Sequence, residues 1–290
     1  MLKDPRHMGP RPPFPAQQQA APGITSALDP VPDHGEHSYR GSGLFEGCAV
    51  LITGGDSGIG RAVSIAFARE GANVLISYLE EHEDARITAR LVEDAGGRAI
   101  LMAGDIGVEQ VCKDLVKRCI SEFGRLDVLI NNAAFQRTHD SLEEISAEEI
   151  QTTFRTNVES MFYLAKAAAE EMKPGGSIIN TTSIQSDSPS APLLAYAATK
   201  AAISNFTANL AQILGPDGIR VNAVAPGPVW TPLIPATMSE AKVKNFGEKT
   251  PLGRPGQPAE IAPAYIFLAS NAASFISGAI LPVTGGLPIL

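Results

Sequence analysis

The fold of this chain is decided by the stretch Thr53-Gly54-Gly55-Asp56-Ser57-Gly58-Ile59-Gly60, which follows the apolar run from Ala49 to Thr53. The run is short enough for a buried strand, and a helical pattern begins at Ile59. Glycines in such a turn allow the backbone to approach a pyrophosphate closely, and the N-terminus of the following helix stabilises its negative charge. A bare turn would also use glycine, but the order strand, turn, helix favours a dinucleotide site.

Short apolar runs rich in Val and Ile alternate with helical patterns along the rest of the chain. This alternation is typical of repeated βαβ units around a parallel sheet. Seven strands are predicted, at residues 49–53, 73–77, 98–103, 128–131, 177–181, 220–225 and 279–283. Gly71, Gly96 and Gly124 stand where the intervening helices should end. The sequence therefore predicts one Rossmann-type, doubly wound α/β domain with seven parallel strands.

The first 46 residues differ from the rest, since they are rich in proline and show little apolar periodicity. We divide the chain into an extended arm, residues 1–46, and the α/β domain, residues 47–290. The arm's composition is typical of a disordered tail, but the arm could also pack on its own or a neighbouring subunit. Proline fixes φ before binding and so lowers the entropy lost on ordering. We expect residues 10–40 to lie ordered across an oligomer, with Phe14 and Leu28 buried.

Composition argues against several classes of function. The net charge is −8 and the pI about 5.2, so the chain lacks the basic surface that nucleic-acid binding requires. Its three cysteines include no CxxC pair and form no metal-ligand pattern. The apolar runs are shorter than the ~20 residues of a membrane span, and the signal-peptide pattern is missing. We expect a cytoplasmic protein without a metal, a nucleic-acid partner or a membrane segment.

A second group of residues, Ser183, Tyr196 and Lys200, lies in the C-terminal half. Tyr196 and Lys200 are four residues apart, so on a helix they share one face. A tyrosine, with an ordinary pKa of about 10, becomes a better acid or base when a nearby ammonium favours its phenolate. Ser183 follows an apolar strand, at the edge where open α/β sheets bind ligands. In isolation, such a serine could simply cap its own turn.

Together these motifs resemble the short-chain dehydrogenase/reductase family over about residues 45–290. The segments that carry the resemblance are the GxxxGxG turn, Ser183, Tyr196-Ala197-Ala198-Thr199-Lys200, Asn131-Asn132-Ala133-Ala134 where the family usually has NNAG, Asn157, Pro226-Gly227 and Gly285-Gly286. The Pro-rich arm and the turn resemble a bacterial general-stress or glucose-dehydrogenase-like subgroup. The resemblance implies the strand order 3-2-1-4-5-6-7 and a homotetramer. Alanine-rich helices around 150–172 and 195–214 fit an oligomer interface.

The resemblance also implies catalytic roles. Tyr196 would be the general acid and base, Ser183 would bind the substrate oxygen, and Lys200 would contact the nicotinamide ribose. Asn157 would support a water that relays protons to the lysine, although a solvated polar helix face would also explain this asparagine.

The implied cofactor contacts extend along the same edge of the sheet. Asp105 would bind the adenine ring, although it could also cap a helix, and Thr231 would hold the nicotinamide carboxamide. The full set of expected cofactor-binding residues is Gly54, Asp56, Ser57, Gly58, Ile59, Gly60, Tyr78, Asp105, Ile106, Asn132, Ala133, Tyr196, Lys200, Pro226, Gly227, Val229 and Thr231.

The cofactor implied by the resemblance is NAD or NADP, and the residues leave both open. An NAD site favours a carboxylate at the end of the second strand, but Tyr78 stands there, with Glu80 and Glu81 slightly later. An NADP site favours an arginine or lysine, which neither Ser57 nor Leu79 supplies. We expect weak discrimination between the two cofactors.

Residues 228–256 contain five prolines and lie near the catalytic edge, so they predict an irregular substrate lid of mixed polarity. The predicted function is hydride transfer between NAD(P)(H) and the alcohol or carbonyl group of a small molecule, such as an aldehyde, a ketone, a sugar or a polyol. A catalytically silent NAD(P)-sensing regulator on the same fold is the alternative, but it would not need Ser183, Tyr196 and Lys200 together.

Overall fold

The computed structural model describes residues 3–289, so residues 1 and 2 of the predicted arm and residue 290 of the predicted domain lie outside the described part. One parallel sheet has the strand order β3-β2-β1-β4-β5-β6-β7, which confirms the expected fold and order. Its strands are β1 (Ala49–Thr53), β2 (Asn73–Tyr78), β3 (Ala99–Ala103), β4 (Val128–Asn131), β5 (Ser177–Thr181), β6 (Arg220–Pro226) and β7 (Ile280–Val283). Each predicted strand differs from these bounds by at most one residue at either end.

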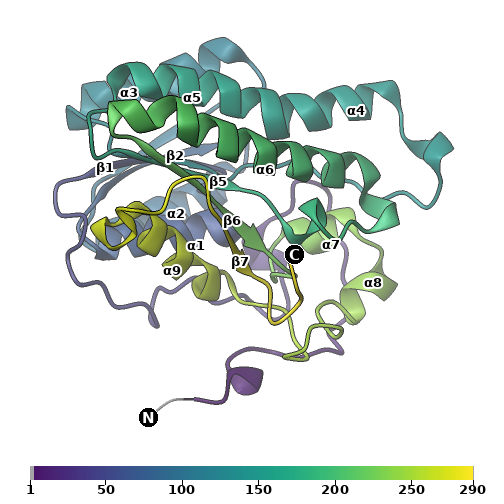
Figure 1. The fold of residues 1–290 in the computed structure, drawn as a ribbon. Helices are drawn as coiled ribbons and strands as arrows, with labels where there is room; N and C mark the ends of the chain where they lie inside the picture. Colours follow the sequence, from purple (N-terminus) through teal and green to yellow (C-terminus); the bar gives the residue numbers. More distant parts are fainter. Residues whose placement is uncertain (1–2, 290) are drawn as a thin grey trace.

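Helices cover both faces of the sheet (Figure 1). One face is covered by α1 (Gly58–Arg69), α2 (His82–Asp94) and α9 (Pro258–Ala269). The other is covered by α3 (Glu109–Phe123), α5 (Ser160–Glu171) and α6 (Leu194–Leu214). Central strands such as β1 are therefore buried along their whole length, which explains their continuous apolar sequence.

The ends of three helices follow the glycine pattern. Gly71 and Gly96 lie just beyond α1 and α2, and Gly124 is the C-cap of α3; all three have positive φ, between 75° and 98°. These conformations are easily reached by glycine alone. The predicted helix ends are confirmed.

The long helix expected around residues 150–172 is interrupted. It divides into α4 (Ala147–Phe154), a π-helical turn (Arg155–Glu159) and α5. A π-turn accommodates one extra residue and often occurs at functional sites. The helix expected at 195–214 is confirmed as α6.

Strand order places the functional edge of the sheet. The chain moves outward from β1 to β2 and β3, then returns to place β4 on the other side of β1. The connections after β1 and β4 therefore diverge to opposite faces and leave a crevice at the carboxyl ends of these strands. The predicted motifs follow these strand ends.

The arm packs against its own subunit. Phe14 and Leu28 are 4% and 3% exposed and form a cluster with Trp230, Ile234 and Val243. The rings of Phe14 and Trp230 stack with 4.3 Å between their centroids. In Figure 1 the purple arm begins at the bottom of the view and passes beneath the segment of α7 (Leu233–Thr237) and α8 (Glu240–Lys244).

These contacts confirm the predicted burial of both anchors and show that the disordered-tail interpretation is wrong. Trp230 Nε1 donates a hydrogen bond to the carbonyl oxygen of Pro30 at 2.7 Å, so the backbone of the arm is held as well as its side chains. The expected course of the arm across an oligomer stays a prediction.

Phe14→Ala should detach the arm from the domain, because it removes the ring that covers Trp230. Deleting a buried phenylalanine costs about 3–5 kcal/mol of stability. If the arm detaches, the loss cannot exceed the free energy with which the arm binds to the domain. Trp230 is the chain's single tryptophan, so its emission should shift to longer wavelength and the melting temperature should fall. Leu44→Ala, at an exposed position of the same arm, is the control. An unchanged emission maximum in Phe14→Ala would show that the stacked ring does not hold the arm.

Candidate active site

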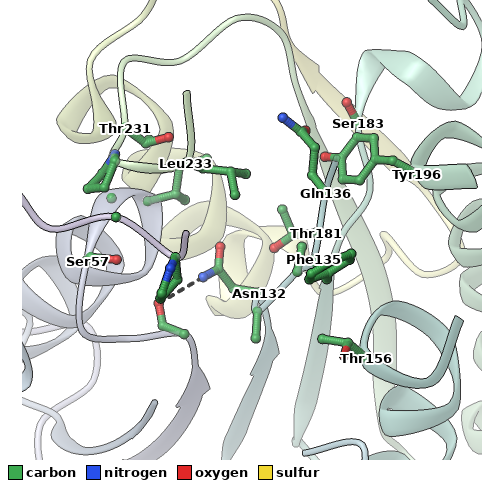
Figure 2. Close-up of a pocket in the computed structure, with 18 of the residues that line it drawn as sticks. Ser57, Asn132, Phe135, Gln136, Thr156, Thr181, Ser183, Tyr196, Thr231 and Leu233 are labelled. Carbon is green, nitrogen blue, oxygen red and sulfur yellow. Dashed lines mark hydrogen bonds between the residues drawn. The ribbon is translucent and has the colours of Figure 1, made fainter. Parts of the chain in front are cut away.

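A cavity of about 490 Å³ lies at the carboxyl edge of the sheet, between the strand ends and the segment of α7. Every predicted site residue lines it except Gly60 and Asn157, which lie directly behind its wall. Figure 2 shows Ser57 and Thr231 on one side of the cavity and Ser183, Tyr196 and Gln136 on the other. We call these sides the turn end and the reactive end.

The turn end is built by close packing of α1 on the glycine-rich turn. A Cβ atom on Gly60 would lie 1.8 Å from the carbonyl oxygen of Gly54, so only glycine permits this approach. Asn132 Nδ2 donates to the carbonyl oxygens of Thr53 and Gly54, at 3.1 Å each, and fixes the turn (Figure 2). Within residues 3–289 no side chain caps the N-terminus of α1. Its first N–H groups are therefore suited to a phosphate, and the turn fits a dinucleotide cofactor.

Carboxylates surround the turn end. Asp56, Glu81 and Asp105 line the cavity. Burial, helped by the nearby carboxylates of Glu81 and Asp84, raises the pKa of Asp56 to about 7, against the effect of a backbone hydrogen bond. This is an acidic environment for the adenosine half of a dinucleotide.

Two side chains near the expected ribose site, Tyr78 and Arg61, are engaged within the protein. The Tyr78 hydroxyl forms a 3.0 Å hydrogen bond with His82 Nδ1. The Arg61 guanidinium is buried and paired with Asp84 at 2.8 Å, so it is not among the cavity's lining residues.

Asp105 lies two residues beyond the end of β3, not in the strand. Its Oδ1 accepts a hydrogen bond from the N–H of Gly107 at 2.8 Å, whereas the N-cap of α3 is Val108. The helix-cap alternative for Asp105 is therefore wrong, and its side chain faces the cavity from a tight local turn.

The reactive end brings together Ser183, Tyr196 and Lys200. Tyr196 lies in the first turn of α6, and Lys200 follows one turn later with 1% of its surface exposed. Lys200 Nζ donates to the carbonyl oxygen of Thr181 at 2.7 Å and lies 5.2 Å from the centroid of the Tyr196 ring. Ser183, two residues beyond Thr181, is hydrogen-bonded to Tyr196.

Burial governs the charges of this group. It raises the pKa of Tyr196 to about 12, and the hydrogen bond with Ser183 acts in the opposite direction. Burial also lowers the pKa of Lys200 to about 7. We expected the ammonium of Lys200 to lower the pKa of Tyr196, and this expectation is wrong for the protein without cofactor, because desolvation disfavours both charged forms.

Asn157 lies in the π-turn and is fully buried, so the interpretation as a solvated helix face is wrong. Its Oδ1 accepts from the N–H of Phe135 at 2.7 Å, and its Nδ2 donates to the carbonyl oxygen of Phe135 and to Thr199 Oγ1. Asn157 thus ties the loop after β4 to the residue before Lys200.

Sequence reasoning missed several residues that line the cavity, among them Gln136, Pro22 and Gly23. Gln136, four residues beyond Asn132, lines the reactive end, and its Nε2 donates to Thr237 Oγ1 on α7 at 2.8 Å. Its only signal in the sequence was its position, two residues after the NNAA motif. Pro22 and Gly23 of the arm also line the cavity, and no sequence pattern marks them.

Across residues 3–289, no cluster of three or more His, Cys, Asp or Glu side chains is arranged to hold a metal ion. None of the helices in this range is both long and apolar enough to cross a membrane.

Comparison with known proteins gives consistent matches. A family model described as "Enoyl-(Acyl carrier protein) reductase" matches residues 54–288. General stress protein 39 of Bacillus subtilis (strain 168) is 50% identical over 274 residues, covering 94% of this chain and 96% of the relative. Two relatives from Arabidopsis thaliana are glucose and ribitol dehydrogenase homolog 2, 47% identical over 94% of this chain and 96% of its own, and chloroplastic NADPH-dependent aldehyde reductase 1, 46% identical over 93% and 96%.

Solved structures share the fold. A short chain dehydrogenase from Burkholderia cenocepacia J2315 in complex with NADP is 33% identical, with a TM-score of 0.78, and the match covers 84% of this chain and 98% of that one. A 3-ketoacyl-(acyl-carrier-protein) reductase from Brucella melitensis complexed with NADH is 32% identical, with a TM-score of 0.76, over 83% and 98%. These two structural matches leave about a sixth of this chain without a counterpart, which is a share as large as the arm. The three relatives, in contrast, match nearly the whole chain.

Lys200→Met should abolish a specific pH dependence of stability. The pKa of Lys200 is lowered from 10.5 to about 7 in the folded protein, so between these values the unfolded chain binds a proton that the folded chain lacks. The wild type should therefore gain stability with rising pH, on the order of 1.4 kcal/mol per pH unit relative to Lys200→Met. Denaturant unfolding from pH 7 to about pH 9.5 measures this, with exposed Lys173→Met as the control. Parallel curves for the wild type and Lys200→Met would contradict the shifted pKa.

Proposed function

The chain belongs to the short-chain dehydrogenase/reductase family of NAD(P)-dependent oxidoreductases, and from this premise we propose that it transfers a hydride between NAD(P)(H) and a small aldehyde, ketone, sugar or polyol. The observation that carries the proposal is the meeting of Ser183, Tyr196 and Lys200 at one end of a cavity whose other end is an uncapped, glycine-rich turn. By their names, the two Arabidopsis relatives act on, or resemble enzymes that act on, glucose, ribitol or aldehydes.

We propose that Tyr196 moves the proton. Bound nicotinamide would supply or accept the hydride at the substrate carbon. Because burial keeps the phenol protonated, Tyr196 is prepared to donate its proton to a carbonyl oxygen that is being reduced. Ser183 would hold the same oxygen by a hydrogen bond, and it is placed for this because it already contacts Tyr196.

Lys200 and Asn157 would act on this proton transfer by different means. The low pKa of Lys200 lets it gain or lose a proton near neutral pH, so it can serve both as a ribose contact and as a charge that favours phenolate when the site closes. We assign Asn157 as a positioning residue, because its contacts are with Phe135 and Thr199 rather than with the cavity.

The substrate would lie between Gln136 and the lid. Leu193, Leu233 and Met238 line the cavity as well as the Gln136 amide, so apolar side chains and a polar group are both available to the substrate. That balance suits a small carbonyl compound with a further oxygen. Spectrophotometric assays of reduced nicotinamide against aldehydes, ketones, sugars and polyols, with both cofactors, test the proposal. Cofactor binding without turnover of any substrate would favour the regulator instead.

We also propose that the protein is a cytoplasmic homotetramer. The outer face of α5 and α6 carries Phe162, Phe206 and Ile213, and two of these side chains, Phe162 and Ile213, are 54% and 66% exposed. Large apolar side chains grouped on a helical surface are typical of an interface between subunits.

Tyr196→Phe should lower turnover by roughly 10²- to 10⁴-fold, because it removes only the proton-transfer group. Cofactor affinity, measured by titration of nicotinamide fluorescence, should hardly change, since the ring stays in place. The phenylalanine in Tyr196→Phe has no hydroxyl and so also loses the hydrogen bond with Ser183. Ser183→Ala removes this hydrogen bond but keeps the Tyr196 hydroxyl, so it is the matched control. Turnover by Tyr196→Phe above a third of the wild-type value would refute the assignment.

The two directions of the reaction should respond differently to pH. With the pKa of Tyr196 at about 12, the phenol stays protonated through neutral pH, so reduction should not require alkaline conditions. Alcohol oxidation needs the phenolate, whose fraction grows about tenfold per pH unit below the pKa, and its kcat/KM should rise steadily from pH 7 to pH 10. Initial rates in both directions over this range provide the measurement. An oxidation rate that is flat with pH would exclude Tyr196 as the base.

A further inference from the structure

The arm crosses the cavity at the turn end. Pro22 and Gly23 line the cavity together with Ser57, Gly58 and Pro232. Ser57 and Gly58 begin α1, where the N–H groups suited to a phosphate are found, whereas Pro232 belongs to the predicted lid. The arm therefore passes over the part of the site that fits the dinucleotide. Pro22 and Gly23 precede the end of β1, at Thr53, by 31 and 30 residues. We call residues 22–25 the strap.

One end of the strap is fixed to the lid. Gly23 has φ of 86°, and a Cβ atom there would lie 2.6 Å from the carbonyl oxygen of Pro232. The N–H of Gln19 donates to the carbonyl oxygen of Pro235 at 3.0 Å, and the Gln19 side chain accepts from the N–H of Ile24 at 2.7 Å. The backbone of the arm therefore contacts the start of α7 on both sides of Pro22.

The other end of the strap is fixed to α2. The N–H of Thr25 donates to Asp84 Oδ2 at 2.9 Å, and Asp84 Oδ1 accepts from Arg61 at 2.8 Å. Thr25, Arg61 and Asp84 are each no more than 4% exposed. A hydrogen bond to a buried carboxylate is among the stronger ones in proteins, so this is a firm attachment. The Thr25 hydroxyl is buried and has no partner among the described residues.

We propose that the strap is part of the cofactor site and controls cofactor exchange. It joins the lid to α2 across the glycine-rich turn, so a dinucleotide held at that turn can leave only when the strap detaches from Asp84 or the lid lifts with it. The strap would slow release of NAD(P)(H) and couple lid opening to it. This inference rests on the proposed function only in requiring that NAD(P)(H) binds in this cavity.

Thr25→Pro tests the attachment with little other change. Thr25 is the first residue of a 3-10 helical turn and follows Ile24 in extended conformation, which are positions where proline is tolerated. The substitution removes the N–H that Asp84 accepts and leaves the Arg61 pair intact. Thr25→Ala, the matched control, removes the unpartnered hydroxyl but keeps this N–H.

The measurement is the dissociation rate of NADH and of NADPH, followed by stopped-flow displacement with excess oxidised cofactor. Thr25→Pro should release the cofactor roughly 10-fold faster or more, the change expected for loss of a hydrogen bond to a charged group. Thr25→Ala should stay within about twofold of the wild type. Equal rates for Thr25→Pro and Thr25→Ala would overturn the proposal. Failure of the wild type to bind either cofactor would instead refute the proposed function.

Hydrogen–deuterium exchange of the wild type keeps the test independent of any variant's folding. Binding of NADPH or NADH should slow amide exchange in the arm peptide that contains residues 19–25, as well as in the glycine-rich turn. Slower exchange confined to the turn and the lid, with the arm unchanged, would also overturn the proposal.

Discussion

The reactive end of the site depends on the hydrogen bond from Lys200 Nζ to the carbonyl oxygen of Thr181. This bond holds the first turns of α6 against the end of β5, and it does so from a side chain that is almost completely buried. Tyr196, one turn earlier, is thereby aimed into the cavity, and Ser183, two residues beyond Thr181, is brought to meet it. The same burial sets the pKa values of both side chains. Position and proton affinity therefore have one physical origin.

Much of the fold could be predicted from the sequence because its signals are local. Continuous apolar strands, helical periodicity and glycines at helix ends each act within about ten residues, and together they gave the strands to within one residue. Site residues that directly follow strands, such as Ser183 and Asp105, were found for the same reason, since parallel strands end at one edge. The strand order itself followed from the family resemblance.

What could not be predicted depends on distant partners or on competing energies. The arm has no periodicity, and its contacts lie far away in sequence: Pro30 meets Trp230, and Thr25 meets Asp84. Gln136 is held by Thr237, 101 residues later. The shift of the Tyr196 pKa was predicted with the wrong sign because spacing reveals a neighbouring charge but not the depth of burial, and here desolvation is the larger effect.

The buried pair of Arg61 and Asp84 connects these parts of the molecule. Desolvation cancels much of the attraction within a buried ion pair. Here both side chains form further hydrogen bonds in addition to the bond between them. Arg61 also donates to Thr88 Oγ1 and to the carbonyl oxygen of Asp56, and Asp84 accepts from Thr25. Its role is thus to fix α1, α2, the glycine-rich turn and the arm at one point.

The π-turn between α4 and α5 has a consequence for how this enzyme can change. Each residue of an α-helix advances the chain by about 100° around its axis, so the extra residue within Arg155–Glu159 sets the rotation of α5 relative to α4. Removing the extra residue would rotate one part of the helix relative to the other. Either the buried side of α5 would turn away from the sheet, or Asn157 would turn away from Phe135. A substitution here leaves the rotation of α5 unchanged, whereas a change in the number of residues does not. Natural variation in this segment should therefore appear as substitutions at constant length, with insertions and deletions confined to the loops on either side.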